Sequence, residues 1–367
     1  MNSQRVITEL QTHGLKFVSD AVGASGRKGG AGPSDHKAVT IGETTIMAPI
    51  YTDSAAQSPY SVNYDPSGQA FLTRDGQVIA SLDFPKQPQF YGLETADGIP
   101  YWKIALLHSR NVLATTVLQT CIRYENRKTA CQFCAIGQSL DAGRTIAQKT
   151  PAQLAEVAEA AVRLDGVEHM IMTTGTPNTT DRGAAYLTEC AKAIRCRVDL
   201  PLQAQCEPPN DFFWFERMKA AGVDSLGMHL EAVDPEVRAN IMPGKARVPL
   251  SYYFEAFVAA VQIFGRGQVS TYLLAGLGDS QETLLTTSER LIDIGVYPFV
   301  VPFVPIVGTP LADHAPPGSE FMFEIYQAIG HQLRRANLRS SDIKAGCAKC
   351  GACSALSMFE GRPNLDT

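Results

Sequence analysis

The chain has 367 residues, which is enough for one large α/β barrel or two ordinary domains. Hydrophobic residues make up 45% and charged residues 19%, a balance typical of a globular protein that forms a core. The net charge of −5 argues against nucleic acid as the main partner, and no apolar run is long enough to span a membrane. The N-terminus also lacks the apolar core of a signal peptide, so we expect a cytoplasmic protein without a membrane partner.

Residues 1–100 predict an α+β cap that is rich in strands. An amphipathic helix is expected over residues 3–21, and a glycine-rich stretch, RKGGAGPSDH, follows at 27–36. Short strand-like pieces come next, with a turn at Asp75 and Gly76 between two of them. The polar residues of the glycine-rich stretch are candidates for closing over a substrate, with a surface linker as the alternative; they are Lys28, Ser34, Asp35 and His36.

From about residue 111, apolar strand-like runs alternate with helical patterns. The predicted strands cover 112–118, 167–173, 200–206, 223–230, 269–275 and 297–304. The predicted helices cover 151–164, 182–195, 211–221, 250–264, 281–294 and 320–335. Six strand–helix units predict an α/β fold, a partial (β/α)6 TIM-like barrel over residues 101–318, followed by a helix and a cysteine-rich tail at 319–367. Such barrels carry their chemistry on loops at the carboxyl ends of the strands.

Nine cysteines in a reducing compartment are more typical of metal ligands or buried thiols than of disulfides. Six of them form two tight triplets, and the first triplet, Cys121, Cys131 and Cys134, falls on the loop after the first predicted strand. Three thiolates on one loop can hold three irons of a [4Fe–4S] cluster and leave the fourth iron open. Nine residues separate the first two cysteines. A zinc site without its fourth ligand, or three unrelated core cysteines, are the alternatives.

The second triplet has the compact CxxCxxC spacing of ferredoxin-like loops and predicts a second Fe–S cluster, with zinc or no metal as alternatives. It consists of Cys347, Cys350 and Cys353. A fourth ligand is missing nearby, and Cys206 is the best candidate within the predicted barrel. The two remaining helical cysteines, Cys190 and Cys196, are expected to pack against the core.

Polar residues also end the other predicted strands. The loop after the second strand, MTTGTPN, suits a polar head group or is an ordinary turn with capping threonines. After the third strand, polar and apolar residues alternate, which is unusual for a strand buried on both faces and favours a site role for Gln203, Gln205 and Glu207. After the fourth strand, His229 and Glu231 share a face, where they would hydrogen-bond a ribose diol or each other.

The motifs resemble, in order and spacing, those of radical S-adenosylmethionine (SAM) enzymes, and they look closest to the biotin-synthase branch. They are the cysteine loop, MTTGTPN, HLEAVDPEVRANIMPGK, LLAGLGDSQET and FVPIVGTPLAD, and they span about residues 111–312. The N-terminal phrase GGAGPSDHKAVTIGETTIMAPIY and the C-terminal CAKCGAC resemble more narrowly the radical-SAM proteins encoded in bacterial nitrilase gene clusters.

The resemblance implies a role for each motif. The first triplet would bind three irons, and the fourth iron would chelate the amino and carboxylate groups of SAM. The residue before the last cysteine would lie near adenine, the TTG loop would bind the methionine amino group, and the His–Glu pair would hold the ribose. Thr176 stands where the family commonly has an acidic residue. The implied cofactor-binding set is Phe133, Thr173, Thr174, Gly175, Gln205, Glu207, His229, Glu231, Gly276 and Gly278.

Two features depart from the family pattern. The long gap in the first triplet contains Arg123, Arg127 and Lys128, which would raise the cluster's potential, bind an anionic substrate or reductase, or simply form a solvated loop. In addition, the strand before LLAGLGD begins at Val269 without a cysteine, whereas biotin synthase holds a sacrificial sulfur cluster with cysteines inside its barrel. This weakens the case for sulfur insertion by that route.

The resemblance implies a [4Fe–4S]-dependent enzyme that cleaves SAM reductively to a 5′-deoxyadenosyl radical, which abstracts hydrogen from a small-molecule substrate. The electron would come from a donor such as flavodoxin or ferredoxin. Nitrile-related metabolism follows from the gene-cluster resemblance alone. The alternatives are a sulfur-insertion enzyme that uses the C-terminal cluster, and a non-catalytic Fe–S or zinc protein of electron transfer or assembly. A metal-independent aldolase-like barrel lacks an obvious Schiff-base lysine at a strand end.

Overall fold

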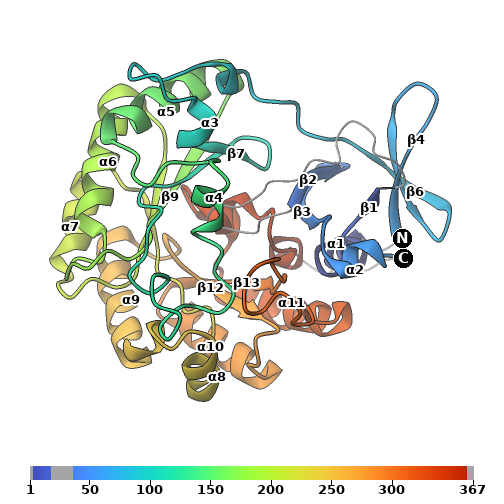
Figure 1. Ribbon diagram of the computed structural model, residues 1–367. Helices are drawn as coiled ribbons and strands as arrows, with labels where there is room; N and C mark the ends of the chain where they lie inside the picture. Colours follow the sequence, from blue (N-terminus) through green and yellow to red (C-terminus); the bar gives the residue numbers. More distant parts are fainter. Residues whose placement is uncertain (1–2, 18–35, 362–367) are drawn as a thin grey trace.

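The central element is a curled seven-stranded sheet that forms an open half-barrel (Figure 1). The computed structural model of the protein describes residues 3–17 and 36–361. The strand order is β13-β12-β11-β10-β9-β8-β7, in which β8 to β13 run parallel and β7 pairs antiparallel with β8. The strands are β7 Leu106–His108, β8 Val112–Thr116, β9 His169–Thr173, β10 Leu202–Gln205, β11 Ser225–Gly227, β12 Val269–Ala275 and β13 Val296–Pro302.

The six predicted parallel strands are confirmed, β12 with the predicted bounds and the others shorter, and the partial barrel is confirmed with them. The edge strand β7 was missed, because its three residues are neither long nor fully buried. Strands β10 and β13 are buried at every position, as expected for parallel strands covered on both faces. The two ends of the sheet, β7 and β13, are not paired with one another, so the barrel stays open on one side.

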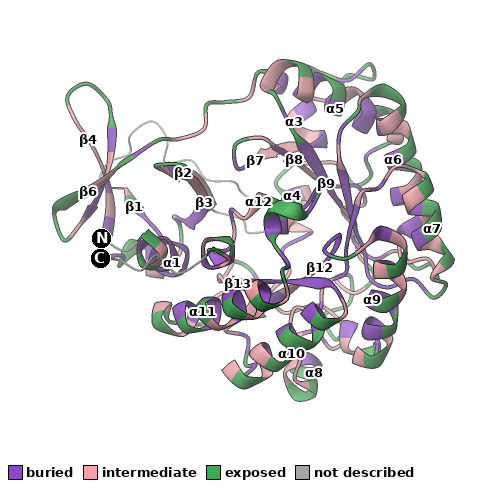
Figure 2. Cartoon of the chain, turned by 180° about the vertical axis from the view of Figure 1, so that it is seen from behind, coloured by how far each residue is buried: buried purple, intermediate pink, exposed green. Residues whose placement is uncertain are grey.

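Amphipathic helices cover the outer face of this sheet, and Figure 2 shows their green exposed faces outside and the purple strands within. Thr150 and Gln153 form a capping box at the start of α5, and Asp234 caps α8. The six predicted helices are confirmed to within two residues at each end, as α5 Pro151–Asp165, α6 Ala184–Arg197, α7 Phe213–Ala220, α9 Leu250–Phe264, α10 Gln281–Asp293 and α11 Ser319–Arg335. Helix α8 Pro235–Ile241 was not predicted, and neither were the short α4 Gln138–Asp141 and η2 Lys245–Arg247.

The N-terminal part forms small sheets beside the half-barrel. The first helix ends at His13, earlier than predicted, because Gly14 takes a left-handed φ of 82° and the chain turns into β1; residues 18–21 of that prediction lie outside the described residues. The predicted turn at Asp75 and Gly76 is confirmed, with positive φ at both positions. The elements are α1 Ser3–His13, β1 Lys16–Phe17, β2 His36–Ile41, β3 Thr44–Pro49, α2 Asp53–Ala56, β4 Tyr60–Tyr64, β5 Ala70–Arg74 and β6 Gln77–Leu82.

A connecting segment joins these sheets to the half-barrel and packs on α5. It contains η1 Gln89–Gly92 and α3 Tyr101–Ile104. The backbone N–H of Gln89 donates to Asp165 at 2.7 Å, and the Tyr101 hydroxyl donates to Glu156 at 2.9 Å. The segment therefore belongs to the outer layer of the half-barrel.

The C-terminal tail fills the interior of the half-barrel at the amino ends of the strands. It contains η3 Ser340–Asp342, α12 Cys347–Cys350 and η4 Leu356–Phe359. Its backbone N–H groups donate to polar side chains at or next to the strand starts: Lys344 to Gln268 at 3.0 Å, Ala345 to Ser225 at 3.4 Å, Gly346 to His169 at 3.3 Å and Cys347 to Gln203 at 3.2 Å. These polar residues can be buried because the tail backbone satisfies them.

The N-terminal elements then cover the tail from outside, so that α12 lies between the sheet and the β2–β3 hairpin (Figure 2). The N–H of Met47 on β3 donates to the carbonyl of Ala352 at 2.7 Å, and the side-chain amide of Gln11 donates to the same carbonyl at 3.0 Å. Gln4 donates to the carbonyl of Met358 at 2.8 Å. Segments from the two ends of the chain thus close the interior together.

Candidate active site between two cysteine triplets

A cavity of about 360 Å³ lies inside the half-barrel, and both cysteine triplets line it. The first triplet contributes Cys121, Cys131 and Cys134 from the carboxyl ends of the strands, and the second contributes Cys347 and Cys353 from the tail. Cys350 is not among the residues that line the cavity. The two triplets, which are more than two hundred residues apart in the sequence, therefore face one shared space.

The first cysteine loop is held closely against the MTTGTPN loop. The N–H of Gly175 donates to the carbonyl of Leu118 at 2.8 Å, and the N–H of Ile122 donates to the carbonyl of Thr176 at 2.9 Å. A Cβ on Gly175 would lie 2.1 Å from the carbonyl oxygen of Thr120, so glycine is required for this close approach. The TTG loop therefore holds the cysteine loop in place through backbone hydrogen bonds and close packing.

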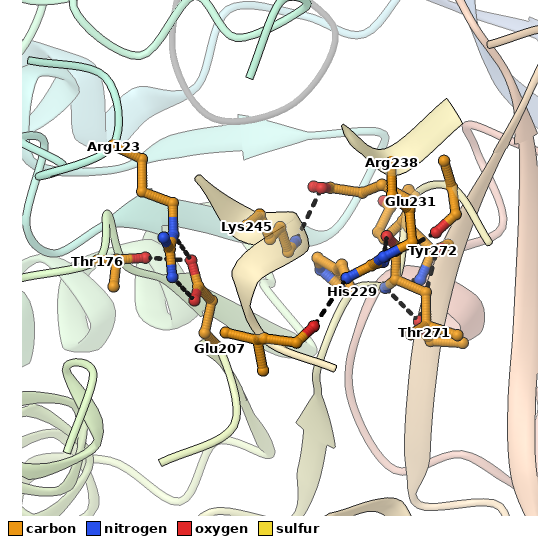
Figure 3. A network of polar contacts seen from close by, with 12 residues as sticks. Arg123, Thr176, Glu207, His229, Glu231, Arg238, Lys245, Thr271 and Tyr272 are labelled. Atoms are coloured by element: carbon orange, nitrogen blue, oxygen red, sulfur yellow. Dashed lines mark hydrogen bonds and ion pairs between the residues drawn. The ribbon is translucent and has the colours of Figure 1, made fainter. Parts of the chain in front are cut away.

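Arg123, in the long gap of the first triplet, forms a buried ion pair. Its guanidinium binds both carboxylate oxygens of Glu207 at 2.6 Å, and only 11% of the Arg123 side chain is exposed (Figure 3). Glu207 also accepts from Thr176 at 2.8 Å and from Arg182 at 3.2 Å. Arg123 is therefore not part of a solvated loop, because the carboxylate just after β10 pairs with it, and its side chain lines the cavity. Arg127 is exposed, as a solvated loop requires.

The same ion pair explains the ionisation of Glu207. Burial alone would raise the pKa of this carboxyl, but the hydrogen bond from Arg123 and the positive charge of Lys245 hold it below its usual value. Thr176, which replaces the acidic residue of the family pattern, is one of the hydrogen-bond donors to Glu207. Glu207 is therefore a structural anchor that is charged and fully hydrogen-bonded.

The turn after α8 supports the far end of the cysteine loop. The N–H of Gly244 donates to the carbonyl of Thr129 at 3.1 Å, and the N–H of Gln132 donates to the carbonyl of Ile241 at 2.8 Å. Arg123 also donates to the carbonyl of Gly244. The nine-residue gap is thus a braced loop, attached at several points to neighbouring strands and helices.

Lys245, directly after that turn, is a site residue that the sequence reasoning missed. Its ammonium pairs with Glu231 at 2.8 Å, and both residues line the cavity (Figure 3). Burial would lower the pKa of Lys245, but the charge of Glu231 and the other groups around it raise it overall, so the lysine stays charged. Glu231 has a left-handed φ of 65°, which is unusual for a side chain and typical of functional sites. The sequence feature that could have identified Lys245 is its position at the end of the motif HLEAVDPEVRANIMPGK.

His229 and Gln205 connect the fourth strand to the second triplet. The N–H of Tyr272 donates to Nδ1 of His229 at 3.2 Å, so the proton of this imidazole is on Nε2, which lies 3.1 Å from Oε1 of Gln205. Burial lowers the pKa of His229 to about 3, with a smaller contribution from Lys245, so the ring is neutral. Nε2 of Gln205 then donates to Sγ of Cys347 at 3.2 Å and to Gln203 at 2.6 Å.

The structure brings most of the predicted site residues to the cavity. Those that line it are the first triplet, Phe133, Thr173, Thr174, Gly175, Gln205, Glu207, His229 and Glu231. Gly276 and Gly278 do not line it. Both have positive φ, and a Cβ on them would meet Pro317 at 2.8 Å and Val237 at 3.0 Å, so their place in the fold is explained by backbone conformation and close packing.

The remaining cysteines divide into buried and exposed ones. Cys190 is fully buried on α6, as predicted, but Cys196 on the same helix is exposed, so its predicted core packing is wrong. Six residues turn a helix by about 240°, which moves Cys196 off the buried stripe. Cys206 lines the cavity beside Glu207. Lys28, Ser34 and Asp35 lie outside the described residues, whereas His36 on β2 lines the cavity.

The first triplet fits a [4Fe–4S] cluster on its own chemistry. Burial raises the pKa of the Cys131 thiol, and that of Cys134 to about 12, so these thiols need positive charge nearby to bind metal as thiolates. Lys245 acts to lower the pKa of Cys131, but its partner Glu231 raises this pKa by more, so binding as thiolates depends on the positive charge of the metal itself. Among the described residues, no three Cys, His, Asp or Glu side chains converge on a single metal position.

Comparison with known proteins decides the family. The profile of the Radical SAM superfamily matches residues 126–291. Residues 126–291 are a domain of the radical SAM superfamily. The chain is 25% identical over 350 residues to the bacteriochlorophyllide c C-7(1)-hydroxylase of Chlorobaculum limnaeum, covering 90% of this chain and 86% of the hydroxylase. It is also 27% identical over 173 residues to the lipoyl synthase of Marinobacter nauticus, covering 46% of this chain and 47% of that enzyme.

A further relative matches a shorter stretch of the chain, and one solved structure superposes on it. The chain is 28% identical over 125 residues to the probable dual-specificity RNA methyltransferase RlmN of Moorella thermoacetica, covering 34% of this chain and 35% of that protein. The crystal structure of methylornithine synthase superposes with a TM-score of 0.47 and 15% identity over 70% of this chain and 75% of the other. Family membership makes the protein a radical SAM enzyme, with a [4Fe–4S] cluster and SAM as cofactors.

One property of the fold can be read directly. In the described part of the chain, no helix combines the length and the apolar composition that crossing a bilayer requires.

Proposed function

We propose that the protein generates a 5′-deoxyadenosyl radical at the first triplet and uses it on a small-molecule substrate bound in the cavity between the two triplets. The observation that supports this most is the shared cavity, which Cys121, Cys131 and Cys134 line together with Cys347 and Cys353. A substrate in this space would lie next to the radical source. The supporting fold is the half-barrel, whose loops place the first triplet at its carboxyl end.

The cofactors supply the bond breaking: with one electron from a donor of the flavodoxin or ferredoxin class, the carbon–sulfur bond of SAM breaks to give methionine and a radical that takes hydrogen from carbon. The chain's own residues would bind and orient SAM. Lys245 offers a buried positive charge for a carboxylate, and Glu231 offers acceptors for hydroxyl or amino groups. Phe133 presents an aromatic face in the cavity that suits adenine.

The remaining lining of the cavity is mostly apolar and suits a substrate with an apolar body. Its walls include Ile171, Leu274, Val301, Phe303 and Ile306. These side chains would exclude water around the reacting carbon, which protects a radical from side reactions. Nitrile-related metabolism stays a prediction that rests on the resemblance to proteins of nitrilase gene clusters.

The second triplet belongs to the proposal as the holder of a second Fe–S cluster. Cys347 receives hydrogen bonds from Gln205 at 3.2 Å and from the Tyr272 hydroxyl. Ser109 donates to Cys350. Donors aimed at sulfur are what an anionic sulfur cluster requires from its surroundings. Sulfur insertion by the route of biotin synthase is not favoured, because β12 carries no cysteine.

Anaerobic reconstitution followed by an assay for 5′-deoxyadenosine with dithionite tests the core of the proposal. The double variant Cys131→Ala/Cys134→Ala is expected to lose SAM cleavage completely, while Cys196→Ala, which changes an exposed cysteine on α6, retains it. Cleavage that survives in the double variant would refute the assignment of the first triplet. Iron analysis of the wild-type protein is expected to give about seven to eight irons per chain, against about four for one cluster.

A further inference from the structure

Gln11, on α1 in the N-terminal part, lines the cavity although it lies outside the half-barrel. Its side chain is 2% exposed, and its amide nitrogen Nε2 donates to the carbonyl of Ala352 at 3.0 Å. The oxygen of the same amide, Oε1, is buried and has no hydrogen-bond partner among residues 3–17 and 36–361. Of the buried side-chain atoms that lack a partner in the part of the chain that the structure describes, this oxygen alone belongs to a residue that lines the cavity.

The orientation of the Gln11 amide follows from its neighbours. The carbonyl oxygen of Ala352 is an acceptor only, and it also receives the backbone N–H of Met47 at 2.7 Å. Turning the amide over would place two acceptor oxygens against each other and lose the hydrogen bond. The amide nitrogen is therefore committed to the tail, and Oε1 is the atom that is left for another molecule.

The second side-chain amide of the cavity and its two carboxylates differ from Gln11, because their oxygens are already engaged. Oε1 of Gln205 lies 3.1 Å from Nε2 of His229. The carboxylates of Glu207 and Glu231 form ion pairs with buried cations. A buried acceptor without a donor costs free energy, and a ligand that donates to it recovers this cost. The group that the Gln11 oxygen lacks is therefore an N–H or O–H donor.

Gln11 belongs to a wall of the cavity that the N-terminal elements build next to the second triplet. This N-terminal wall consists of Gln11, His36 on β2 and Met47 on β3. Ala352, which the Gln11 amide binds, directly precedes Cys353. The residues proposed to hold SAM lie instead on loops at the carboxyl ends of the strands. A molecule held by Gln11 would therefore lie on the side of the second triplet and leave the SAM site open.

We propose that Oε1 of Gln11 accepts a hydrogen bond from the substrate, which has an apolar body and a hydroxyl or N–H group at one end. This inference rests on the proposed function and narrows its substrate class. The hydrogen bond fixes one end of the substrate at the N-terminal wall, and the apolar body then extends toward the radical source. A molecule of the same shape without a donor leaves the acceptor unpaired and binds more weakly. The N-terminal part thus contributes to specificity as well as closing the interior.

The test compares two isomeric probes that differ in the donor. Hexan-1-ol carries a hydroxyl donor, and 1-methoxypentane has the same atoms without one. Dissociation constants are measured by ligand-observed NMR on the anaerobically reconstituted full chain with SAM and without a reductant, so that SAM is not consumed. We expect the wild-type protein to bind hexan-1-ol about five- to tenfold more tightly, which is the effect of one neutral hydrogen bond. Hexanamide and methyl pentanoate are the corresponding pair for an N–H donor, and a preference in either pair supports the proposal.

A variant pair separates substrate binding from the support of the tail. Gln11→Met removes the acceptor and keeps the length of the side chain, so the preference for the donor probe should vanish. It also removes the hydrogen bond to the tail. Gln4→Met is the matched control, because Gln4 lies on the same helix and donates to the tail carbonyl of Met358 at 2.8 Å but does not line the cavity. This control should keep the preference.

Equal affinities within both probe pairs in the wild-type protein, including no binding of any of the four probes, would overturn the role of Gln11. A preference that persists in Gln11→Met would overturn it too. The wild-type comparison needs no variant, so it decides the question even where Gln11→Met does not fold. The failure of the wild-type protein to cleave SAM with dithionite would instead contradict the proposed function, and that assay is independent of the probe affinities.

Discussion

The first triplet lies on a loop braced by buried charge, whereas the second lies on a tail braced by neutral groups. Arg123 pairs with Glu207, and Lys245 pairs with Glu231, around the first loop. The backbone N–H groups of the tail donate to neutral side chains at the strand starts, among them Gln203. The difference shows that one barrel stabilises two sets of thiolates in two ways. Net charge and hydrogen bonds to sulfur set the potential of an Fe–S cluster, so the two sites have separate controls.

The largest effect is expected where buried charge is left unpaired. Glu207→Gln removes the carboxylate that holds Arg123 and Arg182, and it should lower the free energy of unfolding by about 3–5 kcal/mol. Urea unfolding of the metal-free protein measures this change. The control is Glu159→Gln, since Glu159 pairs with Arg197 at the surface with both side chains about half exposed. That change should cost about 0–1 kcal/mol, and similar losses in the two variants would contradict the picture of a charge-braced loop.

A pair of glycine substitutions should separate the two sites. Gly346→Ala puts a Cβ 2.2 Å from the amide of Gln203 at a φ of 123°, so it should displace the tail and lose iron from the second triplet. Gly175→Ala puts a Cβ 2.1 Å from the carbonyl of Thr120 and should lose iron from the first triplet instead. Each should cost about 1–3 kcal/mol of stability.

Iron content and the resonance spectra of the two clusters measure the outcome of these glycine substitutions. Gly361→Ala serves as the control, because nothing lies within 4 Å of the added Cβ. If either variant lost both clusters equally, the two triplets would be coupled parts of one site.

Removing neutral hydrogen bonds is expected to have a smaller effect than leaving buried charge unpaired. Gln205→Leu removes the amide that donates to Cys347 and Gln203 and accepts from His229, and it should cost about 1–3 kcal/mol and lower the reduction potential of the second cluster. A spectroscopic redox titration measures the potential. The control is Gln69→Leu, which removes a side-chain hydrogen bond to the carbonyl of Leu82 on the N-terminal sheet and should leave the potential unchanged. An unchanged potential in Gln205→Leu would show that this amide supports packing and not the cluster.

The sequence was sufficient for the parallel strands, because continuous apolar runs bounded by helices read clearly, and for the cysteine loops. It was insufficient for β7, whose three residues carry no periodic pattern, and for the end of α1, which Gly14 decides. The alternation of Gln203 and Gln205 predicted a site role but could not show their partners, which lie on a tail more than a hundred residues away. The Arg123–Glu207 pair likewise joins residues 84 positions apart, which no local pattern specifies.

The position of the tail has a consequence for how the protein is made. Residues after α11 are synthesised after every strand of the half-barrel, yet they occupy its centre and contact α1. Until the tail has emerged from the ribosome, the strand starts at His169 and Gln203 lack the backbone donors that the tail supplies. The barrel interior can therefore be filled only after the tail has been synthesised, and loading of iron into the tail follows that step.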